Sequence, residues 1–267
     1  MPEFACSEPI KVEVSIGSGS VHITAEERDS ALAEVTPYGD SVGSRTAAEA
    51  TEVVMDGDSL IIEAPQSSRR WHQGEHRIKV NVRVPINSAA WVRVASASVN
   101  CRGRYSDVSV NSASGEIHIE EVTGDVSVKS ASGDARIETV GGKLTAHTAS
   151  GDITAPRVEG AVTARTASGD VEIGEAGSDV RANTASGDLR VETASRGTVS
   201  SKTASGSVIV GVATGTGVWL DLNTVSGSIN NGLDTTATEP ESRDLTIQVR
   251  TVSGDIDITR SRAATPV

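Results

Sequence analysis

The sequence predicts an all-β protein, a parallel β-solenoid with turns of about 18 residues, and three observations support this class. A Thr-Ala-Ser-Gly-Asp motif recurs at a nearly constant interval through the second half of the chain. Between the motifs, apolar residues alternate with polar ones, which is the pattern of short, half-buried strands. Aromatic residues make up only 2% of the chain, so we expect a thin core of Val, Ile, Leu and Ala.

The recurring motif marks one corner of each predicted turn. Its glycines are residues 115, 133, 151, 169, 187, 206, 227 and 254, and the first five are each 18 residues apart. Second corners divide each unit into halves of nine residues, and they lie at Gly124, Gly142, Gly160, Ser178 and Gly197. Glycine suits these positions because it adopts backbone conformations that tight corners require. We expect the alanine of the motif to face a narrow interior.

A short strand is predicted after each corner. Its inward residues come in pairs two positions apart, as in a strand with one buried face. These pairs are Val126 and Val128, Ala135 and Ile137, Leu144 and Ala146, Ile153 and Ala155, Val162 and Ala164, Val171 and Ile173, Val180 and Ala182, and Leu189 and Val191.

Strands joined in this way form either an antiparallel meander or a coil in which every second strand stacks on its predecessor. The near identity of units 18 residues apart favours the coil, because residue i then lies over residue i+18 and like residues form ladders. The repeat loses regularity near the C-terminus, with insertions at 211–217 and 230–244 and bulky residues at Trp219, Leu220 and Leu222. We expect these wider turns to cap the end of the solenoid.

Three segments are expected along the chain. Residues 1–100 form irregular β-strand turns and an N-terminal cap that continue into the solenoid, with a small separate β domain as the alternative. Residues 101–260 form the regular repeats, and residues 261–267 form a flexible tail. An exposed loop is expected at Gln66–Glu75, which is rich in polar residues.

Charge and the two ends of the sequence limit the partners. The net charge of −12 and the pI near 4.9 argue against nucleic acid and against an anionic membrane surface. We find no apolar signal segment and no stretch long enough to span a membrane, so we expect a cytoplasmic protein. The alternative location is the cell surface, reached by a non-classical route.

Cys6 and Cys101 are expected to be reduced thiols, with one disulfide between them as the alternative.

The carboxylates that follow the corner glycines form the candidate metal site, and they are Glu116, Asp134, Asp152, Asp170 and Asp188. In a stacked coil they lie one per layer, about 4.8 Å apart, and a bound calcium ion would relieve their repulsion. The calcium-binding β-roll is built from nonapeptide repeats, but this chain lacks the Gly-Gly-x-Gly part of that pattern. The alternative is that these carboxylates accept hydrogen bonds from backbone N–H groups of the corners. No cofactor is expected.

Other motifs do not point to an active site. The motif hydroxyls, such as those of Thr148 and Ser150, resemble ice-binding arrays, but their corner position favours hydrogen bonds to the turn backbone. His72 and His76 resemble a two-histidine metal motif, but the order is not His-Glu-x-x-His and a loop is expected there. The regular turns 108–210 lack insertions that would build a catalytic cleft around clustered carboxylates. We therefore expect no enzymatic activity.

Outward strand positions carry charges of both signs. They are interpreted either as a solvated face or as a polar binding surface, and the sequence leaves both open. These positions are Lys129, Arg136, Glu138, Arg165, Glu172, Arg181, Arg190, Glu192 and Lys202.

Several segments carry a family resemblance, most clearly Val218–Thr224, Ser226–Asp234 and Arg250–Ile258. Together with the Ser-Gly-Asp repeats, they resemble bacterial β-strand-repeat proteins of unknown function that are labelled adhesin-like, and their actinobacterial branch in particular. The openings Pro9–Val14 and Gly19–Thr24 resemble the same family. The resemblance implies a parallel β-helical fold and no established activity or catalytic residues.

Two functions are therefore expected. The first is a non-enzymatic structural or interaction scaffold that binds a protein, without nucleic acid, membrane insertion or a small-molecule ligand. The alternative is an exported adhesin that binds surface glycans or proteins, with calcium as a possible requirement.

Overall fold

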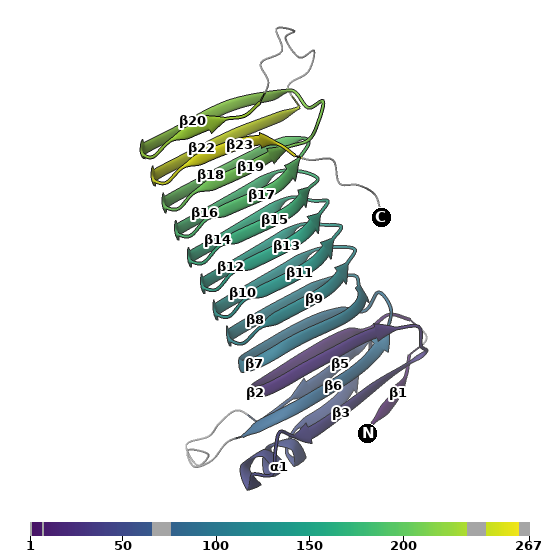
Figure 1. The fold of residues 1–267 in the computed structure, drawn as a ribbon. Helices are drawn as coiled ribbons and strands as arrows, with labels where there is room; N and C mark the ends of the chain where they lie inside the picture. Colours follow the sequence, from purple (N-terminus) through teal and green to yellow (C-terminus); the bar gives the residue numbers. More distant parts are fainter. Residues whose placement is uncertain (1, 7, 66–75, 234–243, 262–267) are drawn as a thin grey trace. The chain divides into compact units, whose positions relative to one another are not determined.

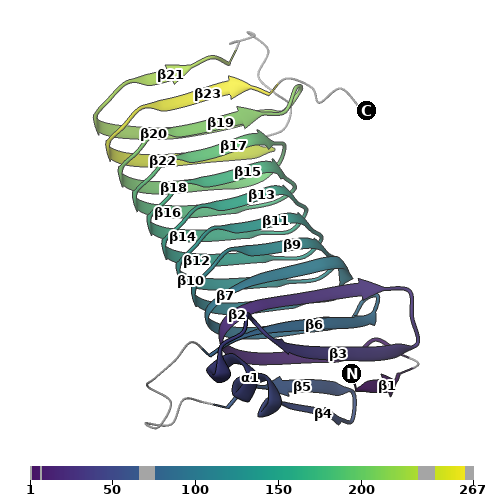
Figure 2. The ribbon, with the colours of Figure 1, turned by 60° about the horizontal axis from the view of Figure 1, so that its bottom comes forward.

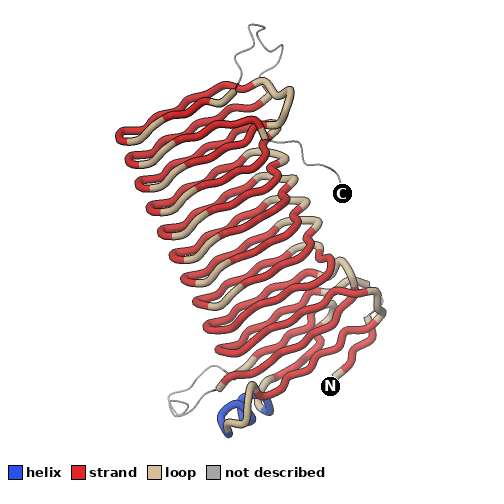
Figure 3. Tube along the Cα trace, in the orientation of Figure 1, coloured by secondary structure: helices blue, strands red, loops and turns tan. Residues whose placement is uncertain are grey.

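The computed structural model describes residues 2–6, 8–65, 76–233 and 244–261, which form 23 strands and one helix (Figures 1 and 3). The chain divides into two compact units, Met1–Ile137 and Glu138–Val267, which we call the N-terminal and C-terminal units. The loop predicted at 66–75 and residues 262–267 of the predicted tail lie outside the described residues. The predicted segment boundaries at residues 100 and 260 stay predictions.

The C-terminal unit is a parallel β-solenoid, as predicted. Each turn contributes one strand to a first sheet and one to a second sheet. In pairing order, the first sheet contains β12 (Leu144–Ser150), β14 (Val162–Ser168), β16 (Val180–Ser186), β18 (Gly197–Ser205), β22 (Leu245–Ser253) and β20 (Val218–Ser226). The second sheet contains β13 (Ile153–Val158), β15 (Val171–Ala176), β17 (Leu189–Ala194), β19 (Val208–Val212), β23 (Ile256–Arg260) and β21 (Ile229–Asn231).

The register within this unit follows the 18-residue period. Val162 pairs with Val180 and Ala164 with Ala182, so equivalent residues of successive turns lie side by side. The inward residues predicted from the alternating pattern are all buried, none with more than 3% of its surface exposed. The core is therefore a set of aliphatic ladders between the two sheets, which explains why so few aromatic residues suffice.

The last turns of the C-terminal unit stack out of sequence order, contrary to a coil in which each turn follows its predecessor. After β19, the chain passes one layer further to form β20 and β21, and then returns to insert β22 and β23 beneath them (Figure 2). The inserted turn carries Ile247, Val249 and Ile256, which are fully buried, whereas Leu220 on β20 is only half-buried. The more apolar turn thus takes the interior position, and the more polar one closes the stack in the described part of the chain.

The N-terminal unit has the same two-sheet arrangement. Its first sheet contains β5 (Ser59–Glu63), the first half of β2 (Lys11–Glu26), the first half of β7 (Ala89–Tyr105), β8 (Val108–Ser114) and β10 (Val126–Ser132). Its second sheet contains β6 (Arg77–Pro85), the second halves of β2 and β7, and β9 (Ile117–Val122). β11 (Ala135–Val140) spans the boundary between the units.

The early strand β2 also lies out of sequence order. It pairs with β7 along one edge and with β5 and β6 along the other (Figure 1). A terminal strand with only one partner would leave a row of backbone N–H and C=O groups unpaired. Insertion between two layers gives this segment partners on both edges.

Antiparallel strands and a helix complete the N-terminal unit. β4 (Glu52–Asp56) pairs with β5, β3 (Ser30–Pro37) pairs with β6, and β1 (Glu3–Ala5) pairs with β3. The helix α1 (Val42–Glu49) was not predicted from the sequence. Ser41 is its N-cap, since its side chain accepts a hydrogen bond from the backbone N–H of Ser44, and an N-cap serine followed by Ala-rich sequence could have indicated it.

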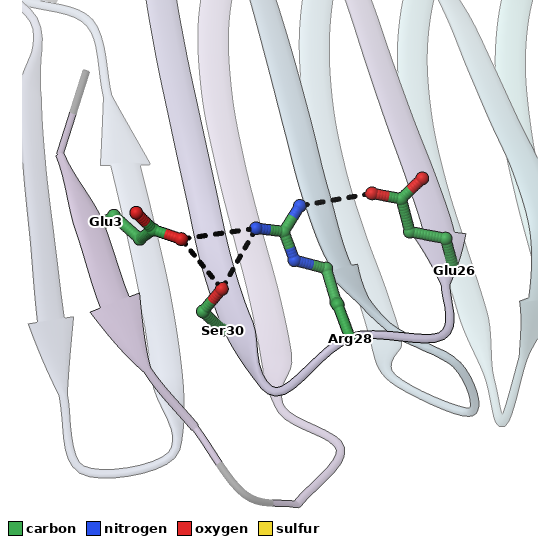
Figure 4. Close-up of polar contacts among 4 residues, drawn as sticks. All are labelled: Glu3, Glu26, Arg28 and Ser30. Carbon is green, nitrogen blue, oxygen red and sulfur yellow. Dashed lines mark hydrogen bonds and ion pairs between the residues drawn. The ribbon is translucent and has the colours of Figure 1, made fainter.

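The start of β3 is joined to β1 by a small polar cluster (Figure 4). Arg28 lies in the turn after β2, and its guanidinium donates hydrogen bonds to Glu26 at 3.2 Å and to the Ser30 hydroxyl at 3.0 Å. Ser30 in turn donates to the carboxylate of Glu3 at 2.9 Å, which lies 3.6 Å from Arg28. The cluster thus holds the short strand β1 against β3.

Candidate functional site

The recurring motif forms the corner between the two sheets, but its Thr and Ala side chains point opposite to our expectation. We interpreted the motif alanine as part of a narrow interior. In β14, Thr166 is buried while Ala167 is exposed, and in the other turns the motif threonine is likewise less exposed than the residue that follows it. The reason is the period of two along the strand: Thr166 shares its face with the inward residues Val162 and Ala164.

The predicted hydrogen bonds from motif hydroxyls to the turn backbone occur only in part. Thr224 donates to the carbonyl of Gly254 at 3.1 Å, and Ser130 donates to that of Ser132 at 3.0 Å. Four buried threonine hydroxyls have no partner among the described residues: Thr148, Thr166, Thr184 and Thr203. For these four the prediction was wrong, because the side chain faces the apolar interior.

The carboxylates after the corner glycines line one edge, and those of the C-terminal unit tie successive layers together. Asp152 accepts a hydrogen bond from the backbone N–H of Asp170, Asp170 accepts one from Asp188, and Asp188 one from Ser207, at 2.7–2.8 Å. This agrees with the second of the two interpretations given above, in which the carboxylates accept hydrogen bonds from backbone N–H groups of the corners. The bond to Ser228 similarly lowers the pKa of Asp255, through the backbone N–H first and the hydroxyl second.

The candidate calcium residues do not form a metal-binding cluster in the described part of the chain. Glu116 and Asp134 in the N-terminal unit occupy the same corner position as the three aspartates of the C-terminal unit, and all are exposed. No group of three or more His, Cys, Asp or Glu residues among the described residues is placed to hold a metal ion. Calcium binding stays a prediction, and a thermal melt with and without millimolar calcium tests it.

Replacing Asp170 by alanine is expected to lower the stability of the C-terminal unit by about 1 kcal/mol, because the N–H of Asp188 loses its acceptor. This corresponds to a fall of about 2–4 °C in the melting temperature. Asp170→Asn retains an acceptor oxygen and should lose less. Glu172→Ala, which removes an exposed carboxylate from a strand face, is the control. Equal melting of Asp170→Ala and the wild type would contradict this role.

The outer face of the first sheet in the C-terminal unit carries a basic column. The column is formed by the residue directly before each motif threonine, in pairing order His147, Arg165, Asn183, Lys202, Arg250 and Asn223. None of these six residues is acidic, although the whole chain has a net charge of −12. Beside the column, the next outward positions are Thr145, Thr163, Arg181, Ser200, Gln248 and Asp221.

The charges of this face are largely uncompensated within the described chain. Arg165, Arg181 and Lys202 form no ion pair with a described residue, and Asp221 is the only carboxylate among these outward positions. Asp221 lies 4.0 Å from Arg250 on the outermost pair of strands. The second sheet differs, since it pairs opposite charges: Arg157 contacts Glu175 at 2.7 Å. Of the charges that appeared mixed in the sequence, those on the first sheet are basic, whereas the second sheet carries both signs, as at Arg190 and Glu192.

The N-terminal unit has a groove beside the outer face of its first sheet. Its volume is about 1170 Å³, and it is lined by segments of β2, β7, β8 and β10, by Ala47 of α1, by Ala64 and Pro65, and by the start of β6. Three cationic side chains line it, from Arg77, Arg93 and Lys129. Of these, only Lys129 was among the outward charges identified from the sequence. The missed signal was the position before each motif, where every repeat has a basic residue or asparagine.

The histidines and cysteines do not form a catalytic set in the described residues. His72 lies outside the described residues, His76 lines the groove, and His22, His118 and His147 lie on three separate strands. Cys6 and Cys101 are both free thiols, as expected. Burial raises the pKa of Cys101 to about 12, so this thiol is protonated at neutral pH.

These features define a parallel β-solenoid with polar outer faces. The sequence matches the family model described as Toastrack DUF4097 over residues 8–259, so the chain belongs to this family. A search of curated proteins finds no match. No helix among residues 2–6, 8–65, 76–233 and 244–261 has the length and apolar character needed to cross a membrane.

Three solved structures are similar over almost their full length. A candidate adhesin from Bacteroides fragilis is 13% identical with a TM-score of 0.44, covering 96% of this chain and 95% of that one. A candidate lipid binding protein from Parabacteroides distasonis is 15% identical with a TM-score of 0.49, covering 97% and 96%. A candidate cell adhesion protein from Clostridium sporogenes is 11% identical with a TM-score of 0.26, covering 97% and 98%. We draw no functional conclusion from likenesses this distant.

Proposed function

We propose that the protein is a non-enzymatic binding scaffold that holds a protein partner against the outer face of the first sheet in its C-terminal unit. The basic column carries this proposal. It presents one polar side chain per layer, about 4.8 Å apart, on a regular sheet. Rows of this kind give a repeat protein an extended binding surface.

The charge of the column indicates an acidic partner surface. Arg165 and Lys202 are exposed and have no carboxylate partner in the described chain, so an acidic surface would meet charges that are not already neutralised. Complementary charge of this kind chiefly increases the association rate and the selectivity for a partner. The described residues that line the groove include no Asp or Glu, whereas hydrolysis of a glycosidic polymer generally depends on a pair of carboxyl groups.

The test compares two double charge reversals with the same change in net charge. Arg165→Glu with Lys202→Glu alters the basic column, and Arg157→Glu with Arg190→Glu alters the second sheet. Each tagged protein is used to co-purify partners from a native lysate, and bound proteins are identified by mass spectrometry. We expect an acidic partner that is lost with the first variant and retained with the second. Failure to recover any reproducible partner, or equal recovery with both variants, would contradict the proposal.

A second candidate function is an exported adhesin that binds surface glycans or proteins. The groove of the N-terminal unit favours it, because a concave site lined by hydroxyl and cationic groups suits a polar polymer better than a flat protein surface. Fractionation of the source cells tests this candidate together with our expectation of a cytoplasmic location. Recovery of the protein only in the cytosolic fraction of its source cells would exclude export.

A further inference from the structure

We infer that the groove of the N-terminal unit binds an acidic polysaccharide with one acidic group in each disaccharide. The inference gives the second candidate function a ligand class, but it concerns the purified protein and requires neither export nor a protein partner. The groove, of about 1170 Å³, is large enough to enclose several sugar rings of a chain.

Two of the three cations of the groove, Arg93 and Lys129, lie two layers apart at the same register position. Arg93 on β7 pairs with Asn111 on β8, which pairs with Lys129 on β10, so two inter-strand spacings separate the cations. The third cation, Arg77 at the start of β6, pairs with Ser18 on β2, and Ser18 pairs with Ser96 on β7. Arg77 therefore lies two layers from β7 and three residues along the strand from Arg93. Since strands lie about 4.8 Å apart, positions two layers apart are separated by about 9.6 Å.

These cations are available to a ligand. No Asp or Glu is present among the described residues that line the groove. Arg93 and Lys129 make no ion pair with any described residue, whereas Lys11 on the same unit contacts Glu13. Arg77 lies over the ring of Tyr38, 4.2 Å from its centre, which holds the guanidinium in place without neutralising its charge. The groove therefore favours an anionic ligand.

The layers between the cations supply neutral hydrogen-bonding groups. Ser15 and Ser18 lie on β2, and Asn111 and Ser112 lie on β8. An alternation of charged and neutral polar layers matches a chain in which acidic and neutral sugars alternate. An extended acidic peptide matches it less well, because side chains on one face recur at about 6.6–6.8 Å rather than at about 9.6 Å.

The described lining residues of the groove can bind a polysaccharide but do not provide the groups needed to cleave it. Hydrolysis of a glycosidic bond generally requires a pair of carboxyl groups on either side of it. The described lining residues contain none, so the groove would hold the polymer intact.

The experiment measures binding of a hyaluronan decasaccharide to the purified full chain by isothermal titration calorimetry. Hyaluronan has one carboxylate in each disaccharide. We expect binding that weakens as salt increases, because charge pairs are screened. Dextran, which is neutral, should not bind. Arg93→Ala with Lys129→Ala should weaken binding by about tenfold or more.

The matched control is Arg83→Ala with Arg102→Ala, which removes the same charge from exposed positions on the second sheet of the same unit. It should bind as the wild type does, and thermal melts show whether each variant is folded. Equal weakening by both double variants would indicate non-specific charge attraction and overturn the inference. So would absence of hyaluronan binding by the wild type. Equally tight binding of poly-glutamate of matched length would assign the groove to acidic peptides instead.

Discussion

Replacement of Val171 by aspartate is expected to destabilise the C-terminal unit by more than about 4 kcal/mol. Val171 is only 1% exposed and lies in an aliphatic ladder between Ile153 and Leu189. A carboxylate at this position would be buried without a counter-charge, between layers too close together to admit the water that would solvate it. The penalty is thus the cost of desolvating a charge, with no compensating bond.

Urea and thermal unfolding followed by circular dichroism would measure this effect. The matched control is Val225→Asp, the same substitution on a strand of the same unit where the side chain is 77% exposed. We expect the control to melt close to the wild type, because its carboxylate stays in water. If Val171→Asp also melted close to the wild type, the inward assignment of the alternating residues would be wrong.

Replacement of Gly187 by alanine is expected to have the second large effect, a loss of about 2–4 kcal/mol. Gly187 forms a motif corner with a φ of +148°, which L-residues rarely adopt. A Cβ atom at this position would also lie 2.7 Å from the carbonyl carbon of Gly169 and still nearer to its oxygen. Both atoms belong to the backbone of the preceding layer, so they cannot move aside without disturbing the stack.

A substitution at a second glycine distinguishes the strain of a positive φ from the steric clash with the preceding layer. Gly215 in the same unit has a φ of +81°, but nothing lies within 4 Å of the position of an added Cβ. Gly215→Ala should therefore show only the conformational cost, about 1 kcal/mol. Equal losses in the two variants would show that close stacking of the corners contributes nothing, contrary to the geometry.

The regular part of the fold was predictable from the sequence because periodicity carries long-range information. A repeat of 18 residues implies that Val162 and Val180 occupy equivalent positions, and the structure pairs them. Alternation then identified the buried residue of each pair correctly. The motif was harder to interpret, since Thr166 and Ala167 are adjacent and only the direction of the strand decides which of them faces the interior.

The ends of the stack were not predictable in the same way. Insertion of β2 between β6 and β7, and of β22 between β18 and β20, depends on contacts between segments far apart in the chain. No local pattern encodes which edge a strand will choose. The choice follows from pairing of backbone edges and burial of the more apolar turn, both of which are properties of the assembled sheets.

The candidate sites likewise combine features that the sequence predicts with features that only the assembled sheets determine. The sequence by itself determined the layered β-solenoid, its inward ladders and the column of Asp and Glu along one edge, because each depends on period and alternation alone. Only the tertiary structure decided that these aspartates accept hydrogen bonds from the next layer, and that the outward charges of the first sheet in the C-terminal unit are mainly basic while the second sheet carries both signs. It also decided that Arg77 joins Arg93 and Lys129 in one groove. These features depend on which distant strands become neighbours, and that is fixed when the sheets assemble.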